Sequence, residues 1–114
     1  MLTNFEILEE KIGDTIILRV KGELDALVAP QLKDKLIKLT ENGVKKIIID
    51  FKELVHINSL AMGILRGRLK EIRENDGDLK LINLNSHIST IFEMVGLDEL
   101  FDIYDNENEA LESF

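Results

Sequence analysis

The sequence predicts a single α/β domain in which helices pack on a mixed sheet. Three observations lead to this fold class. Two strand-like segments come first and are joined by a turn, and apolar runs then alternate with amphipathic helical segments. The run at residues 46–51 lacks the alternation of a half-exposed strand, which is typical of a strand buried on both faces. We expect about four main strands in one domain over residues 1–114, since no linker-like or repeated segment is present.

The N-terminal part predicts a hairpin followed by a helix. Residues 5–10 and 15–21 are the two strands, joined by a Gly-Asp turn, and Gly22 is expected to end the second strand. Pro30 fits the first turn of the next helix, where its missing N–H does no harm. The Asn-Gly pair at residues 42–43 is expected to end this helix.

The remainder of the chain alternates strands with helices. The helix that begins at Ser59 is expected to end at the Asn-Asp-Gly segment of residues 75–77, and the following helix at Gly96. We expect strands at residues 46–51, 79–84 and 101–104, and helices at residues 59–74, 86–94 and 106–114.

The composition limits the functions that are open to the chain. Cysteine is absent, and His56 and His87 do not have the spacing of metal ligands, so we expect no metal and no cofactor. The net charge of −8 disfavours nucleic acid and anionic membranes as partners. The basic cluster at residues 66–73 also contains acidic residues and is interpreted as a solvated helix face. We found neither a signal-peptide pattern nor an apolar run near the roughly 20 residues of a membrane span, and expect a cytoplasmic protein.

The helix predicted at residues 59–74 has an unusual apolar pattern. Leu60 and Ile64 lie away from its core face, beside Gly63 and Gly67. Either a neighbouring helix or loop covers these two side chains, or they form a partner-binding patch. Glycine costs about 1 kcal/mol relative to alanine in a helix interior. We therefore expect another backbone to approach Gly63 and Gly67 closely.

Asn58 and Ser59 stand where this helix begins. Either residue is suited to be the N-cap. The same position also suits a functional serine, because a helix N-terminus carries free N–H groups and partial positive charge. A phosphate on Ser59 would be accommodated there, and its charge of about −2 would face a docked partner. Ser59 would then switch binding without switching the fold.

Three segments together resemble a known family. Residues 22–36, GELDALVAPQLKDKL, contain Gly22, Asp25 and Pro30 in a G-x-(L/I)-D…A-P-x-L pattern. Residues 45–65, KKIIIDFKELVHINSLAMGIL, are similar to a strand, a connection and a D-S-(S/T)-G-L-G helix start. With residues 79–111, they make the chain resemble the STAS family, and within it the small bacterial anti-sigma factor antagonists.

The resemblance implies a function and a set of site residues. Such a protein binds an anti-sigma factor, often a serine kinase, and thereby releases a sigma factor for transcription. The kinase phosphorylates the serine that follows the motif aspartate, the antagonist dissociates, and a phosphatase reverses the reaction. That serine is Ser59, our candidate phosphorylation site, on a protein that we expect to be a monomer. The candidate partner-binding residues are Asp25, Asn58, Ser59, Leu60, Gly63 and Ile64.

The chain departs from the family pattern beside Ser59. Asn58 replaces the motif aspartate, Leu60 replaces the second hydroxyl residue and Ala61 replaces the first glycine. A kinase that positions the hydroxyl through the aspartate would phosphorylate Ser59 slowly or not at all. For Asp25, a role as a turn or capping residue is the alternative to a role in binding.

Other functions remain open. Catalysis is disfavoured because Ser59 and the nearby His56 do not make a triad, and the common nucleophile and phosphate-binding motifs are missing. His56, just before a helix, is an alternative phosphocarrier residue. Within the STAS family, the chain is alternatively a subunit of a lipid-transport or other regulatory complex.

Overall fold

The computed structural model describes residues 4–114, so the first three residues of the domain predicted over residues 1–114 lie outside the described part. The hydrophobic and capping patterns produce alternating strands and helices. In chain order the elements are β1 (Phe5–Ile12), β2 (Thr15–Leu24), α1 (Ala29–Glu41), β3 (Lys46–Ile57), α2 (Ser59–Glu74), β4 (Asp78–Ile82), α3 (Ser86–Met94), the 3-10 helix η1 (Leu97–Glu99), β5 (Ile103–Tyr104) and α4 (Glu107–Glu112).

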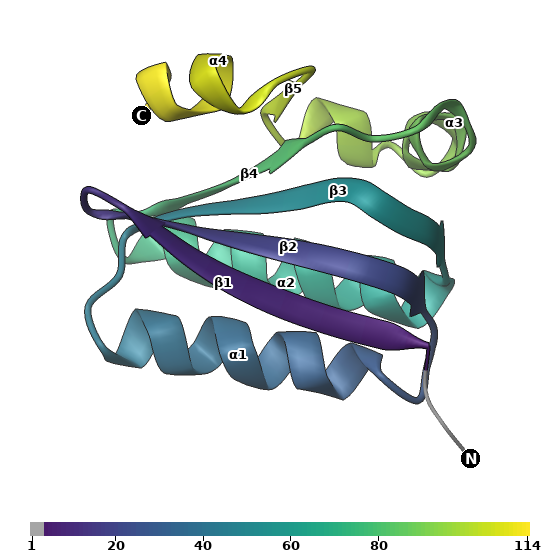
Figure 1. Cartoon of the computed structure of the whole chain (residues 1–114), viewed down its shortest axis with the longest axis horizontal. Coiled ribbons are helices and arrows are strands. Elements are labelled where there is room, and N and C mark those ends of the chain that lie inside the picture. Colours follow the sequence, from purple (N-terminus) through teal and green to yellow (C-terminus); the bar gives the residue numbers. More distant parts are fainter. Residues whose placement is uncertain (1–3) are drawn as a thin grey trace.

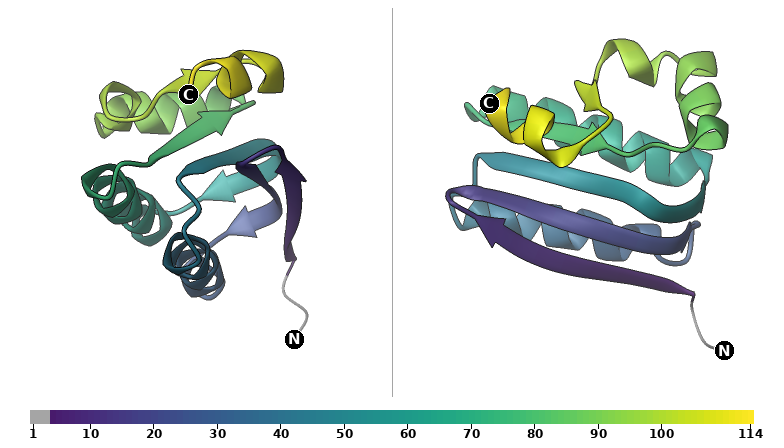
Figure 2. Two further views of the ribbon diagram at one scale, coloured as in Figure 1. Left: turned by 90° about the vertical axis from the view of Figure 1, so that its left-hand side faces the viewer. Right: turned by 45° about the horizontal axis from the view of Figure 1, so that its top comes forward.

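Five strands form one mixed sheet in the order β1-β2-β3-β4-β5 (Figure 1). β1 and β2 are antiparallel, and the other neighbouring pairs are parallel. Helices α1 and α2 lie side by side on one face of the sheet, and α4 packs on the opposite face (Figure 2). The predicted α/β class with a mixed sheet is confirmed. The short β5 is an edge strand beyond the four main strands.

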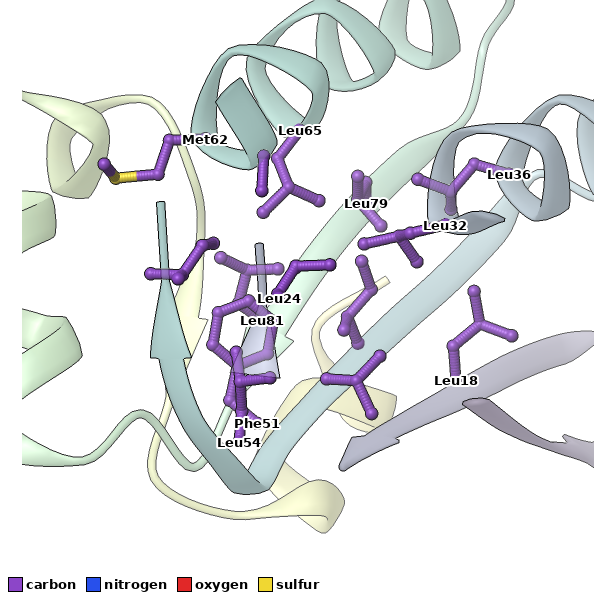
Figure 3. Packing of buried hydrophobic residues seen from close by; sticks show 14 of the residues in the cluster. Leu18, Leu24, Leu32, Leu36, Phe51, Leu54, Met62, Leu65, Leu79 and Leu81 are labelled. Carbon is purple, nitrogen blue, oxygen red and sulfur yellow. The ribbon is translucent and has the colours of Figure 1, made fainter. Parts of the chain in front are cut away.

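The central strands place apolar side chains on both faces of the sheet. In β3, Ile47 and Ile49 belong to the main cluster under α1 and α2, whereas Ile48 belongs to a smaller cluster with Ala110 of α4. Leucines from β2, α1 and α2 belong to the main cluster and point toward one another (Figure 3). Burial on both faces explains why residues 46–51 show no alternation.

Three strands are longer than the sequence predicts, and the first of them, β1, continues to Ile12 instead of ending at residue 10. β2 continues to Leu24, so the expectation that Gly22 ends this strand is wrong. Gly22 has a φ of 100° at an irregularity in the pairing of β2 with β3, and a Cβ atom there would lie 1.6 Å from the backbone oxygen of Asn4. Glycine is therefore required inside the strand. β3 likewise continues to Ile57, and the segment expected to be a connection before Ser59 is strand.

The later elements match the prediction apart from their ends. α2 and α3 have the predicted bounds. β4 ends at Ile82, earlier than expected, because Asn83 adopts a left-handed φ of 61°. The terminal helix is shorter than residues 106–114, since Asn106 is its N-cap and accepts a hydrogen bond from the N–H of Glu109 (2.9 Å). In the described part of the chain, no helix has the length and apolar character needed to cross a membrane.

A buried lysine lies on the α4 face of the sheet. The side chain of Lys80 is 4% exposed, and its Nζ lies 3.0 Å from Oδ2 of Asp102. The ammonium group also lies 4.9 Å from the ring centroid of Phe114. Burial lowers the pKa of Lys80, but the hydrogen bond and charge of Asp102 outweigh it, so the pKa is raised above its ordinary value.

Candidate functional site

Asp25 and Ser59 lie at the same edge of the sheet. Asp25 directly follows β2, and Ser59 begins α2 one residue after β3 ends. β2 and β3 are parallel neighbours in which Leu24 is the partner of Ile57, so their carboxyl ends coincide. The backbone N–H of Asn58 donates to the carbonyl of Leu24 at 3.1 Å. This bond ties the turn that contains Asp25 to the start of α2.

Asn58 is the N-cap of α2. Its backbone is extended, with φ −100° and ψ 174°, and its Oδ1 accepts a hydrogen bond from the N–H of Ala61 at 2.9 Å. Its carbonyl accepts the first helical hydrogen bond, from the N–H of Met62, at 3.1 Å. Of the two residues that the sequence offers as caps, the structure selects Asn58.

The Ser59 hydroxyl is exposed at the start of α2 and contributes no side-chain hydrogen bond to the structure described for residues 4–114. The cap and the first helical bond use the N–H groups of Ala61 and Met62, which leaves those of Ser59 and Leu60 at the open end of the helix. The serine is thus presented beside free amide donors.

Asp25 stabilises the turn that precedes α1. Its Oδ1 accepts hydrogen bonds from the N–H groups of Leu27 (2.9 Å) and Val28 (3.2 Å), and its carbonyl accepts one from Ala29 (2.9 Å). The structure therefore supports the turn-residue interpretation of Asp25. The residue is also exposed, so its carboxylate stays accessible beside the start of α2.

Most of the predicted site residues line one groove between α1 and α2, which we call the serine groove. It has a volume of about 350 Å³. Leu60 is 51% exposed, whereas Ile64 is half-buried and packs against the main cluster. The interpretation that a neighbouring element covers the side chain is therefore confirmed for Ile64, whereas Leu60 is uncovered and stays a candidate for a partner-binding patch. The lining residues are Lys33, Ser59, Leu60, Gly63, Ile64, Gly67 and Arg68.

The glycines of α2 face open space. A Cβ atom at Gly63 or at Gly67 would meet no other heavy atom within 4 Å. The expectation that another backbone approaches them closely is wrong for the described part of the chain. The cost of two helical glycines is therefore not offset by packing that the structure shows.

The two histidines lie together, which the sequence did not indicate. His56 is near the end of β3 and His87 is in the first turn of α3, and their ring centroids are 5.9 Å apart with an interplanar angle of 27°. The signal that would have found them is that His56 stands near the carboxyl end of β3, and His87 follows β4, the parallel neighbour of β3. In the part of the chain that the structure describes, no cluster of three or more metal-ligating side chains is found.

The fold and the site define an α/β domain that presents an exposed serine at the first turn of a helix, beside a shallow groove. Comparison with known families gives its identity at the family level. The chain belongs to the STAS domain family, whose model matches residues 6–110.

Relatives of known name cover most of the chain. It is 33% identical over 88 residues to the anti-sigma-B factor antagonist of Bacillus subtilis (strain 168), a match that covers 77% of this chain and 80% of that protein. It is 28% identical over 95 residues to the anti-sigma-B factor antagonist of Staphylococcus aureus (strain NCTC 8325 / PS 47), covering 83% and 86%. The phosphorylated form of the Bacillus cell fate determinant SpoIIAA superposes with a TM-score of 0.75 and 26% identity, covering 94% of this chain and 97% of that one.

Proposed function

We propose that this chain is an anti-sigma factor antagonist that binds an anti-sigma factor and so releases a sigma factor for transcription. The observation that carries the proposal is the exposed Ser59 hydroxyl at the first turn of α2, freed from capping by Asn58. The names of the relatives support the same function, since two of them are anti-sigma-B factor antagonists.

The proposed docking surface is centred on Ser59. Leu60 supplies an exposed apolar contact, and the accessible part of the half-buried Ile64 side chain extends this apolar surface into the serine groove. Gly63 leaves room for a partner side chain to enter the groove. Asn58 and the accessible carboxylate of Asp25 complete the surface at the sheet edge. Such a surface has an apolar centre and a polar rim, as protein interfaces do.

Phosphorylation of Ser59 is the proposed control. A serine kinase acting as the anti-sigma factor would add a group of charge about −2, and the free N–H groups of the first turn of α2 would accommodate it. The fold would persist because the capping hydrogen bond belongs to Asn58. The partner would then face a charge where it had bound a hydroxyl, and would dissociate until a phosphatase restored the serine. Asn58 carries no charge, so the residue that directly precedes Ser59 does not repel the phosphate.

The proposed setting is the cytoplasm, with the chain acting as a monomer. Its kinase and sigma-factor partners work on transcription there, and a single copy presents the whole of the proposed surface. Sedimentation of the purified chain measures the oligomeric state. A stable dimer whose interface covers Ser59 would contradict this part of the proposal.

Binding to a purified anti-sigma kinase from the same cell tests the function. Calorimetry should show binding for the unmodified chain and for Ser59→Ala, and a loss of at least about tenfold for Ser59→Asp. Incubation of the kinase with ATP, followed by mass spectrometry, should place phosphate on Ser59. Recovery of transporter subunits instead of an ATP-binding kinase by affinity capture would favour a role in a transport complex. An acid-labile phosphate on His56 would identify a phosphocarrier.

A further inference from the structure

A second groove runs along the other flank of α2, toward the η1 segment, and we call it the basic groove. Its volume is about 690 Å³, larger than that of the serine groove. Gly63 and Gly67 line both grooves, so they form the low ridge that separates them. The other residues of the basic groove are Arg66, Leu69, Lys70, Arg73, Glu74 and Leu100.

The charge of the basic groove is opposite in sign to the net charge of the chain. The chain carries a net charge of −8, yet three cations and only one carboxylate line this groove. Arg66 and Lys70 enter no ion pair found within residues 4–114. Arg73 is held in place by Oδ1 of Asp78 (3.0 Å from Nε) and by the carbonyl of Leu100 (2.8 Å from one terminal nitrogen). The groove therefore presents a fixed cation and two available ones.

The shape of the basic groove suits an elongated apolar ligand. A Cβ atom at Gly67 would meet nothing within 4 Å, and the side chain of Leu100, 39% exposed, stands at the opposite wall. Small residues on one helix let the axis of a second helix approach closely. The groove is an open channel, whereas a pocket for a small molecule encloses most of its ligand.

We propose that the basic groove binds an acidic amphipathic helix of a protein partner. Apolar side chains at helical spacing would pack against Gly63, Gly67 and Leu100, and carboxylates on the flanks would reach Arg66 and Lys70. This charge complementarity involves only the residues of the basic groove. The net charge of the whole chain, −8, would instead favour a basic partner. The basic groove shares Gly63 and Gly67 with the serine groove but does not include Ser59, so binding there does not require phosphorylation of Ser59.

Two synthetic peptides of about 18 residues, long enough to form a helix, test the proposal. They share the same leucines at helical spacing, and one carries glutamates on its polar face where the other carries lysines. Each is titrated into the ¹⁵N-labelled full chain and followed by amide chemical shifts. The glutamate peptide should bind more tightly, with shifts centred on Arg66, Lys70 and Leu100, which line the basic groove and not the serine groove. Tighter binding of the lysine peptide, as the net charge alone would favour, overturns the proposal.

Matched variants locate the binding site. Lys70→Glu should weaken binding of the glutamate peptide by about fivefold, whereas Lys38→Glu, the same charge change on an exposed position of α1, should alter it by less than about twofold. Gly67→Leu should fill the groove and abolish binding while circular dichroism stays unchanged. The proposal is wrong if the shifts centre on Ser59, if Lys38→Glu weakens binding equally, or if a second copy of the chain occupies the groove in the absence of peptide.

Discussion

Replacing Asn58 with alanine should destabilise the domain, whereas replacing Ser59 with alanine should not. Asn58→Ala removes the 2.9 Å hydrogen bond from the N–H of Ala61 to Oδ1, and loss of such a cap costs about 1 kcal/mol. The bond from the backbone N–H of residue 58 to Leu24 survives, because alanine keeps that donor. Ser59→Ala removes an exposed hydroxyl from the helix and should change the free energy of unfolding by less than about 0.5 kcal/mol.

A third variant, Asn58→Asp, separates capping from charge. Aspartate caps a helix as well as asparagine does, and its negative charge at the N-terminus of α2 should add about 0.5 kcal/mol at low salt. That gain should shrink as salt is raised, since the residue lies near the surface. Asn58→Asp also restores the aspartate of the family pattern, and should increase the rate of Ser59 phosphorylation by a kinase that uses this carboxylate.

Urea unfolding followed by circular dichroism measures all three variants. For a domain of this size, 1 kcal/mol corresponds to a fall in the melting temperature of roughly 4 °C, which thermal unfolding resolves. If Ser59→Ala destabilises the domain as much as Asn58→Ala does, the serine shares the capping role. Our reasoning that the hydroxyl is free for a partner would then be refuted.

Three further predictions concern other parts of the fold, and urea unfolding measures each. Gly22→Ala should cost at least about 3 kcal/mol, because φ is 100° and a backbone oxygen lies 1.6 Å from the new Cβ. Gly67→Ala, in a helix and facing open space, should stabilise the domain by about 1 kcal/mol. Equal effects of the two substitutions would contradict the different roles of these glycines. Ile64→Ala should cost about 1 to 2 kcal/mol and exposed Leu60→Ala less than about 0.5 kcal/mol, and the reverse order would contradict the assignment of Ile64 to the core. The pKa of Lys80 is raised in the folded state, so the charged lysine stabilises the fold. This stabilisation is complete below the unfolded-state pKa and is lost as the pH rises through the folded-state pKa. The wild type should therefore lose stability at alkaline pH more steeply than Lys80→Met does.

The hydrophobic period of the sequence was enough to predict the fold class and the bounds of α2 and α3. It did not predict the full lengths of β2 and β3. Gly22 has the local character of a strand end, but tertiary pairing with β3 carries the strand through it in a left-handed conformation. Similarly, residues 52–57 lack a strong apolar run, and they are strand because β2 lies beside them.

Part of the candidate site follows from local chemistry and part requires the tertiary structure. The capping preferences of Asn58 and Ser59 placed both residues at the helix start, but only the geometry shows which side chain accepts the hydrogen bond. The serine groove depends on the packing of α1 against α2. The pairing of His56 with His87 depends on strand order, which the sequence does not reveal at the level of single residues.

The capping hydrogen bond of Asn58 has a consequence for how such a domain can evolve. Because the start of α2 is held by position 58, the residue at position 59 can change without loss of the folded chain. Under the proposed phosphorylation control, replacement of the serine codon by one for alanine or for aspartate would then fix a descendant copy in a permanently binding or a permanently released form. After gene duplication, copies of one ancestral domain could thus acquire different fixed outputs while they keep the same scaffold.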